Sequence, residues 1–316
     1  MLKAVILAAG MGTRMKSKMP KVVHEVMGKC MVEHAIMAAK EAGADEICVV
    51  VGHGADYVKS RIKSKVTYVT QEQQLGTGHA VKCARDFIGT EGETLILFGD
   101  TPLITGETLK KLTETHRENG NAITVLSTII DNPTGYGRII RDGNNNFLKS
   151  VEHKDATEEE RLCREVNSGM YIFNAGELYD ALDLLTNDNA QKEYYLPDTL
   201  MIIRDKGLKV DAMVIEDATE IEGVNSRVQL SHAEEVMKLR INRRLMEQGV
   251  TIIDPNTTYI EQDAVIERDV TIYPDTVIMG NSFIGEDSVI GPFSYLKNAR
   301  IERGSELEPY SKIVGK

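Results

Sequence analysis

The chain of 316 residues contains no tryptophan, and aromatic residues make up only 5% of it. Proteins that bind single-stranded nucleic acid stack the bases on aromatic side chains, so this composition disfavours that class. Positive charge is also scarce, because 37 Lys and Arg against 48 Asp and Glu leave a net charge of −11. A nucleic-acid partner is therefore not expected. A local cluster of cations in such an acidic chain indicates a site for a small anion.

Cysteine patterns and long apolar runs are missing as well. The four cysteines are widely spaced and form no C-x-x-C pair, which argues against a zinc site and a disulfide framework. The first apolar run is only about seven residues long and leads straight into a glycine turn, as a core strand does and a signal peptide or membrane span does not. These features predict a cytoplasmic protein with no membrane partner.

Residues 7–21, LAAGMGTRMKSKMPK, place a glycine-rich turn directly after an apolar strand. Gly10 and Gly12 allow the loop to bend sharply and to direct its amide groups at a bound anion. Such a loop at the carboxyl end of a first strand suits a nucleoside triphosphate. No G-K-[ST] ends the run, and Met15 stands where a dinucleotide-binding fingerprint has its third glycine, which argues against both of those motifs. The cations around the turn are Arg14, Lys16, Lys18 and Lys21.

Up to about residue 130, short apolar runs alternate with segments of helical spacing. This alternation is typical of βαβ units around a mostly parallel sheet and predicts an α/β, Rossmann-like domain. The stretch 135–147, GYGRIIRDGNNNF, predicts a hairpin or wide turn. We expect strands at 3–8, 46–51, 66–70, 94–98, 122–128, 147–152, 166–173 and 210–215, and helices at 31–42, 54–63, 78–88 and 106–118.

A different pattern governs the last part of the chain. Residues 227–248 carry apolar side chains every three or four positions and predict a helix that links two domains. From Ile260 to Leu296 a large aliphatic residue recurs at every sixth position, and after a slip of one residue the repeat resumes at Ile301. This is the hexapeptide repeat of a left-handed parallel β-helix, here with about three coils. We expect domains at 1–226 and 250–316 with a linker helix at 227–249. The open end of so short a solenoid favours a homotrimer or further coils, and whether residue 316 is the native end stays open.

Seven motifs in order give the chain a family resemblance. It resembles the bacterial N-acetylglucosamine 1-phosphate uridylyltransferases, which form the first half of a bifunctional enzyme, over essentially all its residues. The resemblance implies Mg²⁺-dependent transfer of a uridylyl group from UTP to N-acetylglucosamine 1-phosphate, as precursor supply for peptidoglycan and lipopolysaccharide. The motifs are LAAGMGTRM with Pro20 and Lys21, QEQQLGTGHA at 71–80, LFGDTPL at 97–103, GYGRI at 135–139, VEHKDA at 151–156, EVNSGMY at 165–171 and GVNSR at 223–227.

The resemblance also implies roles for individual residues. Arg14 and Lys21 would act on the phosphates, and Asp100 and Asn225 would hold the metal. Phe98 stands where the family often has tyrosine, so no hydrogen bond from that ring is expected. The implied substrate contacts are Leu7, Ala8, Ala9, Gly10 and Lys21 for the nucleotide, Gln71, Gly76 and Thr77 for uracil, Phe98, Gly99 and Asp100 at the end of the fourth strand, Gly137, Glu152 and Asn167 for the sugar, and Asn225.

The expected chemistry needs no protein nucleophile. An oxygen of the sugar 1-phosphate already carries charge and attacks the α-phosphorus while pyrophosphate leaves, so the obstacle is to bring two anions together. Mg²⁺ prefers oxygen ligands and keeps few protein ligands beside substrate phosphates, which suits one carboxylate and one amide. Cations at the loop would stabilise the charge that gathers on the phosphates.

Other interpretations stay open at this point. Asp100 could cap a turn, Asn225 could be a structural loop residue, and Glu152 could be a solvated carboxylate. Hexapeptide β-helices also serve acetyltransferases that use acetyl-coenzyme A, although the family's acetyl-transfer residues lie beyond residue 316 and we expect that activity to be absent. A related nucleotidyltransferase with another sugar or dTTP, and a non-enzymatic nucleotide sensor, are the remaining alternatives.

Overall fold

The computed structural model describes residues 1–315, which group into two compact units. The first unit comprises Met1–His24 and Cys30–Asn225, and the second comprises Glu25–Lys29 and the chain from Ser226 onward. The helix after Ser226 and a short early turn thus belong with the C-terminal coils by their contacts. The domain limits expected at residues 226 and 249 stay a prediction.

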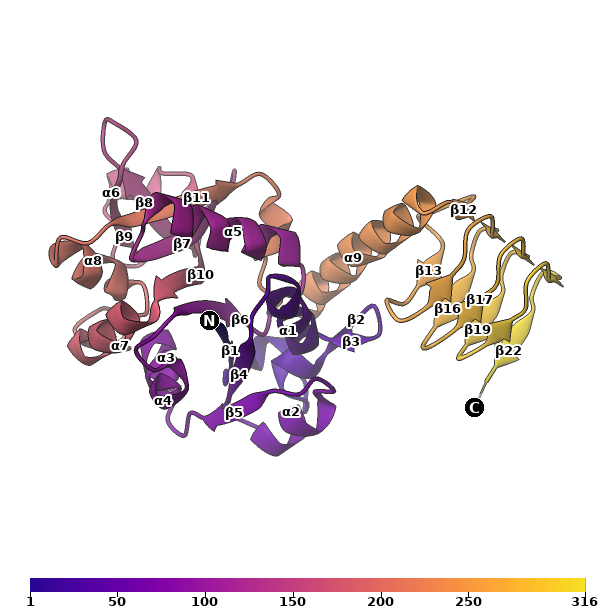
Figure 1. Cartoon of the computed structure of the whole chain (residues 1–316), viewed down its shortest axis with the longest axis horizontal. Coiled ribbons are helices and arrows are strands. Elements are labelled where there is room, and N and C mark those ends of the chain that lie inside the picture. Colours follow the sequence, from indigo (N-terminus) through magenta and orange to yellow (C-terminus); the bar gives the residue numbers. More distant parts are fainter. Residues whose placement is uncertain (316) are drawn as a thin grey trace. The chain divides into compact units, whose positions relative to one another are not determined.

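A nine-stranded sheet forms the centre of the first unit (Figure 1). Its order explains the alternation in the sequence, because four of the six neighbouring pairs on its main path are parallel and are joined through helices. One strand, Glu165–Asn174, runs antiparallel to both of its neighbours on the main path. In spatial order the main path is β11 (Val210–Ile215), β7 (Ile123–Ile129), β10 (Glu165–Asn174), β6 (Glu93–Phe98), β1 (Leu2–Ala8), β4 (Glu46–Val51) and β5 (Thr67–Thr70).

Helices cover both faces of this sheet. Alternate side chains of β1 enter different cores: Ile6 packs with one helical layer and Val5 with the other. Because both faces are buried, the strand is a continuous apolar run and not an alternating one. One layer holds α1 (Met31–Glu41), α2 (Ala55–Arg61) and α5 (Gly106–Asn119), and the other holds α3 (Thr77–Cys83), α4 (Arg85–Ile88), α7 (Ala175–Leu184) and α8 (Asp198–Asp205). A further short helix, α6, spans Glu158–Arg161.

The GYGRI segment begins a hairpin that extends the sheet. Strand β8 (Gly137–Arg141) pairs antiparallel with β9 (Phe147–Val151) and also with the first part of β10. The pairing of β10 with β7 then shifts register between Asn167 and Tyr171. A bulge of this kind turns the intervening side chains away from the regular alternation.

Most expected elements of this unit are present, with one difference and three helices that were not expected. The segment expected as a single helix over 78–88 is two helices, since the backbone leaves the helical region at Ala84, where ψ is 9°. Helices α6, α7 and α8 were not expected. Helix α7 follows β10 without a turn residue, because Asn174 ends the strand and also occupies the N-cap position of the helix.

The second unit begins with α9 (Arg227–Glu247). Ser226 caps this helix by accepting a hydrogen bond from the Gln229 amide at 3.2 Å. Asn242 is fully buried and donates to the carbonyls of Pro255 and Thr258 at 2.8 and 2.9 Å, which fixes the helix to the first coil. The turn of a small hairpin, β2 (Glu25–Val26) and β3 (Lys29–Cys30), packs here too. None of the described helices is long and apolar enough to cross a membrane.

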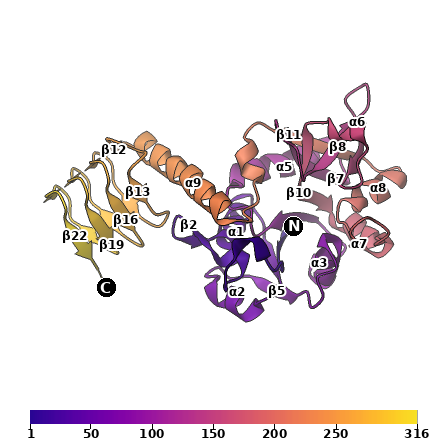
Figure 2. The same ribbon diagram turned by 180° about the vertical axis from the view of Figure 1, so that it is seen from behind.

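The hexapeptide repeat forms a three-sided parallel β-helix, visible as stacked coils in Figure 2. The repeated aliphatic side chains fill its core: Ile272, Ile278, Ile284 and Ile290 are all fully buried. The three sides consist of β12 (Thr251–Ile252), β15 (Thr271–Ile272), β18 (Val289–Ile290) and β21 (Glu306–Leu307), then β13 (Tyr259–Ile260), β16 (Val277–Met279), β19 (Tyr295–Lys297) and β22 (Lys312–Val314), and then β14 (Val265–Ile266), β17 (Phe283–Ile284) and β20 (Arg300–Ile301).

The expected slip in the repeat is a shortened corner. Phe283 pairs with Arg300, 17 residues later, whereas Tyr259 pairs with Val277, 18 residues later. The missing residue lies between β19 and β20, where Asn298 takes a positive φ of 48°. One residue fewer at a corner leaves the core register of the next coil intact.

Candidate active site

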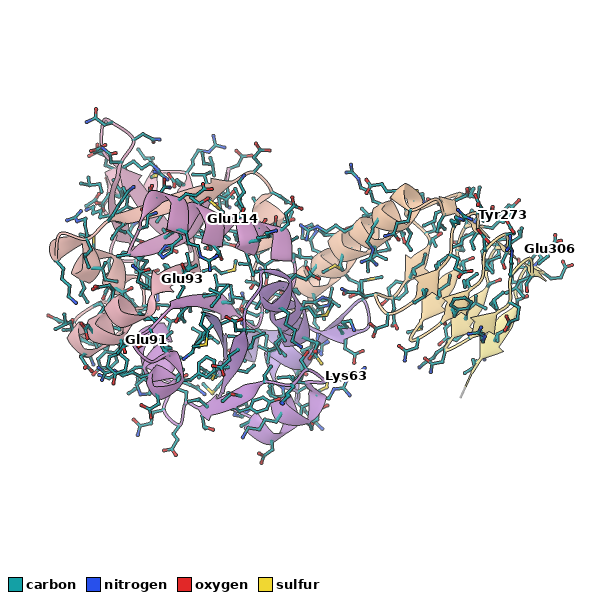
Figure 3. The ribbon with its side chains drawn as sticks, in the orientation of Figure 1. Lys63, Glu91, Glu93, Glu114, Tyr273 and Glu306 are labelled. Carbon is teal, nitrogen blue, oxygen red and sulfur yellow. The ribbon has the colours of Figure 1, made fainter. Side chains whose placement is uncertain are left out.

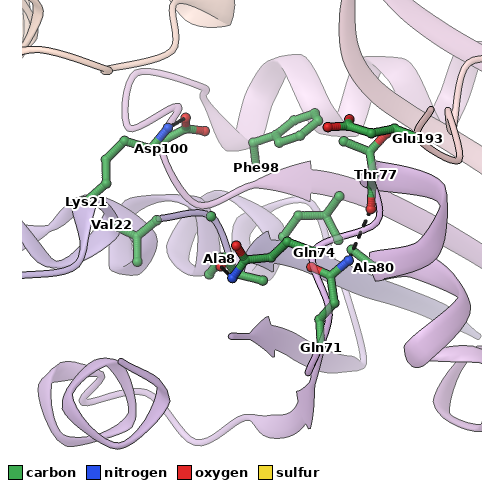
Figure 4. A pocket seen from close by; sticks show the side chains of 14 residues that line it. Ala8, Lys21, Val22, Gln71, Gln74, Thr77, Ala80, Phe98, Asp100 and Glu193 are labelled. Atoms are coloured by element: carbon green, nitrogen blue, oxygen red, sulfur yellow. Dashed lines mark hydrogen bonds and ion pairs between the residues drawn. The ribbon is translucent and has the colours of Figure 1, made fainter. Parts of the chain in front are cut away.

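A cavity of about 280 Å³ opens at the carboxyl ends of β1 and β6 (Figure 4). This edge of an open α/β sheet is where loops can direct backbone groups at a ligand. Residues from three sequence motifs meet here. The lining consists of Leu7, Ala8, Ala9, Gly10, Lys21, Val22, Gln71, Gln74, Gly76, Thr77, Ala80, Phe98, Asp100 and Glu193.

The glycine loop folds back onto Lys21. Gly12 has a positive φ of 62°, and a Cβ there would lie 2.5 Å from the Lys21 Cβ. No side chain fits in that gap, so Gly12 lets the loop close over the base of the lysine. Gly99 does not line the cavity, but its amide donates to the Leu7 carbonyl at 2.9 Å and ties the end of β6 to the end of β1.

Lys21, Asp100 and Asn225 form one polar cluster. The Lys21 ammonium donates to a carboxylate oxygen of Asp100 and, at 2.7 Å, to Oδ1 of Asn225. Two further bonds orient the pair: the Val224 amide donates to the Asp100 carbonyl at 2.8 Å, and Asn225 Nδ2 donates to the Gly223 carbonyl at 3.2 Å. The amide oxygen of Asn225 therefore points at the cation and its NH₂ points away.

The donor set of this cluster fits a hard divalent cation. A carboxylate oxygen and an amide oxygen converge on one positive centre, which in this structure is the Lys21 ammonium. Among residues 1–315 no group of three or more His, Cys, Asp or Glu is arranged to hold a metal. Mg²⁺ is commonly bound by one or two protein oxygens, with substrate phosphates and waters as its other ligands.

The far end of the cavity is held by two loops bonded to each other. The Tyr194 amide donates to the Leu75 carbonyl, and the Gly78 amide donates to the Tyr194 carbonyl, each at 2.8 Å. Gly76 has a φ of 108°, and a Cβ there would lie 2.6 Å from the Tyr194 carbonyl oxygen. The close approach of the loops requires glycine at that position. On the other side of the cavity, Gln74 Nε2 donates to the Ala9 carbonyl at 3.0 Å.

A second cavity of about 230 Å³ adjoins the first, and the two share Thr77, Phe98 and Glu193. Three residues implied as sugar contacts lie in it together, namely Gly137, Glu152 and Asn167. The rest of its lining is Gly135, Tyr136, Ser168, Gly169, Tyr171, Gln191, Tyr195, Leu196 and Pro197.

The bulge in β10 shapes this second cavity. Asn167 Oδ1 accepts from the Gly169 amide at 2.8 Å, and its Nδ2 donates to Ser150 Oγ at 3.1 Å. Gly169 has a φ of 79°, and a Cβ there would lie 2.5 Å from the Phe98 ring. The ring therefore packs on bare backbone and forms the partition between the two cavities.

Carboxyl groups gather at the second cavity. Burial raises the pKa of Glu152, and the nearby Asp198 and Asp155 carboxylates raise it further. Burial, with a smaller effect of Asp155, raises the pKa of Asp198 to about 6. The second cavity therefore suits a ligand with an uncharged ring and many hydroxyl groups, because hydroxyl donors stabilise a buried carboxylate.

Not every implied residue lies in the cavities. Arg14 is exposed on the short 3₁₀ turn η1 (Thr13–Met15) and is not part of either lining. Sequence reasoning missed Glu193 and Tyr195, which come from a stretch without periodic pattern. No pattern in the sequence marks them as part of the site.

Two family models match the chain. MobA-like NTP transferase domains match residues 4–161, and the bacterial transferase hexapeptide, described as six repeats, matches residues 263–298. A crystal structure of UDP-glucose pyrophosphorylase complexed with UDP-glucose shares the fold, with a TM-score of 0.63 and 20% sequence identity over 75% of this chain and 98% of that one.

Curated relatives match far more closely. The chain is 57% identical over 265 residues to the bifunctional protein GlmU of Caldanaerobacter subterraneus subsp. tengcongensis, which covers 84% of this chain and 58% of that protein. It is 53% identical over 314 residues to the protein of the same name from Clostridioides difficile, covering 99% of this chain and 68% of that protein. The chain thus spans about 58–68% of the length of these relatives.

The fold and the cleft beside Lys21 define a nucleotidyltransferase domain followed by a hexapeptide, left-handed β-helix. Within that class the relatives are specific. The chain belongs to the family of the bifunctional GlmU proteins, which confirms the resemblance and the fold class expected from the sequence.

Proposed function

We propose that this chain transfers a uridylyl group from UTP to N-acetylglucosamine 1-phosphate and releases pyrophosphate. The observation that carries the proposal is the pair of adjoining cavities, one beside the Lys21 cluster and one lined by Gly137, Glu152 and Asn167. The family implies UTP in the first and the amino sugar in the second. The product would supply the synthesis of peptidoglycan and lipopolysaccharide in the cytoplasm.

The reaction requires orientation more than acid–base chemistry. An oxygen of the sugar 1-phosphate forms a bond to the α-phosphorus of UTP, and the bond to the β-phosphate breaks, so that pyrophosphate leaves with the electron pair. Holding two reactants in line can supply roughly 7–11 kcal/mol of the barrier. Lys21, fixed at the end of the glycine loop, neutralises phosphate charge, while Phe98 and Thr77 stand where the two ligands would meet.

Mg²⁺ is the proposed cofactor, with Asp100 and Asn225 as its protein ligands. Bound there, it would reduce the repulsion between the two phosphorylated substrates. Lys21 would then turn from Asp100 toward the phosphates. Arg14, exposed on its turn, is proposed to reach the phosphates only with nucleotide bound.

Replacement of Asp100 by Ala tests the metal assignment. We expect pyrophosphate release to fall by at least about 100-fold, since one charged group at the reacting phosphates is lost. The assay couples pyrophosphate release to a dye with UTP, N-acetylglucosamine 1-phosphate and Mg²⁺. Asp188→Ala serves as the control, because its side chain is 94% exposed.

Two outcomes would contradict the proposal. Near-normal turnover by Asp100→Ala, with unchanged circular dichroism, would remove Asp100 from the metal site. No pyrophosphate release by the unmodified chain, across UTP, dTTP and a panel of sugar phosphates, would refute nucleotidyl transfer.

A further inference from the structure

His79 lies in the first turn of α3, beside the side chain of Gln71 in the first cavity. Gln71 is only 4% exposed. Its Nε2 donates to the Gly76 carbonyl at 3.1 Å and contacts His79 Nδ1 at 3.0 Å. Figure 4 shows Gln71 and Gln74 on the cavity wall, with a dashed bond from the Gln71 amide nitrogen.

These two contacts fix the orientation of the Gln71 carboxamide. A backbone carbonyl can only accept, so the atom facing Gly76 must be the NH₂ nitrogen. That nitrogen has a second hydrogen, and His79 Nδ1 is placed to accept it. The neutral imidazole then carries its own proton on Nε2.

The consequence concerns the remaining atom of the amide. With both hydrogens of Nε2 engaged, the amide presents only its oxygen for a further bond. No hydrogen bond to Gln71 Oε1 is formed by the residues that the structure describes, and Gln71 lines the cavity. The cavity therefore offers a fixed acceptor at this point.

We propose that His79 is a positioning residue for base selection, which holds the Gln71 oxygen toward the base. This inference rests on the proposed function and deepens it. Uracil carries an imide N3–H donor between two carbonyls, which a fixed acceptor recognises. Cytosine has a bare N3 lone pair at the same place, which would face the Gln71 oxygen with like partial charge.

Why His79 is needed follows from the geometry. The Gly76 bond alone leaves the amide free to swing about that single contact. The second bond, to a side chain on α3, removes that freedom. Position 79 must therefore carry a hydrogen-bond acceptor, because a donor or an apolar ring cannot accept the second hydrogen of Gln71 Nε2.

The test compares His79→Phe with His79→Asn. For His79→Phe we expect the KM for UTP to rise about 5- to 10-fold, the range for one lost hydrogen bond, and the preference for UTP over CTP to fall by a similar factor. The KM for the sugar phosphate and kcat should hardly change. His79→Asn, whose amide oxygen can stand in for Nδ1, should restore the UTP preference to within about twofold.

A second background separates positioning from packing. The Gln71→Ala variant has no side-chain amide at this position. The double variant Gln71→Ala/His79→Phe should therefore have the same KM for UTP as Gln71→Ala alone. His53→Phe, the same change at an exposed histidine, is the matched control.

Additive effects of His79→Phe and Gln71→Ala, or unchanged UTP preference in His79→Phe, would overturn the role of His79 while leaving the proposed function intact. Absence of turnover with UTP by the unmodified chain would overturn both.

Discussion

Lys21 has two neighbours that come from distant parts of the chain. Its ammonium contacts Asp100, 79 residues later, and Asn225, 204 residues later. Only 13% of its side chain is exposed, so the charge is stabilised mainly by these oxygens. A charge held in this way is ready to exchange one anionic partner for another, which is what phosphate binding beside a divalent cation requires.

Asp198 gives a pH-dependent prediction at the same scale. Because its pKa in the fold is about 6, above the ordinary 3.8, the folded protein binds this proton more tightly than the unfolded chain does. The stabilisation of the folded state by this tighter proton binding is complete below the pKa of Asp198 in the unfolded chain, and it is lost as the pH rises through about 6. Replacement by Asn should therefore stabilise the protein most above pH 6, with a benefit that shrinks toward pH 4.

Urea unfolding at a series of pH values measures this difference. Asp188→Asn, at an exposed carboxylate, should follow the unmodified protein throughout. Parallel stability profiles for Asp198→Asn and the unmodified protein would contradict the prediction.

At the scale of elements, one buried carboxylate joins a helix to the loop that carries Asn225. Glu220, in the 3₁₀ turn η3 (Ala218–Ile221), accepts from the Thr105 amide and hydroxyl, each at 2.9 Å, and from the Thr108 hydroxyl at 2.8 Å. Thr105 is the N-cap of α5, so the negative charge also lies at the positive end of that helix.

Glu220→Ala should lower the free energy of unfolding by about 2–4 kcal/mol, since three donors lose a charged acceptor in a buried place. It should also reduce turnover, because the chain reaches Asn225 five residues later. Glu220→Gln keeps one acceptor oxygen, which can still accept from Thr105, and should cost less. Glu118→Ala, on the exposed face of α5, is the control in denaturant titration. Equal stability of Glu220→Ala and the control would refute this role.

The elements also show where sequence patterns are sufficient. Strands such as Glu46–Val51 are short apolar runs between helical segments, and local pattern placed them correctly. Helix α8 was missed because TLMIIRD is as apolar and β-branched as a buried strand. The break at Ala84 between α3 and α4 depends on packing against α7, which no local pattern contains.

At the scale of the whole molecule, the coils of the second unit present exposed aromatic side chains at one corner. Phe293 and Tyr310 stack with ring centroids 5.0 Å apart, and both are at least half exposed. Tyr273, labelled in Figure 3, is 42% exposed nearby along the same run of corners. Exposed apolar groups of this kind favour association, and we propose a homotrimer.

Light scattering should give three times the chain mass of 35.1 kDa. Ile290→Asp, which buries an unpaired carboxylate in the coil core, should abolish the trimer, whereas Val265→Asp, on an exposed side of a coil, should leave the core intact. A monomeric mass for the unmodified chain at all concentrations would contradict the proposal.

The sequence by itself determined the repeating parts of this protein. The glycine turn after β1, the strand and helix alternation, the hexad coils and the shortened corner are all local or periodic, because side-chain spacing along a strand or coil directly sets which face is buried. Family motifs added the site residues, although not their arrangement.

Only the tertiary structure decided which of those residues meet. It brought Lys21, Asp100 and Asn225 together and left Arg14 outside the cavities. It also placed Glu193 in the lining of both cavities and placed His79 beside Gln71. Such contacts join residues far apart in the chain or fix one side-chain rotation, and neither leaves a periodic trace in the sequence.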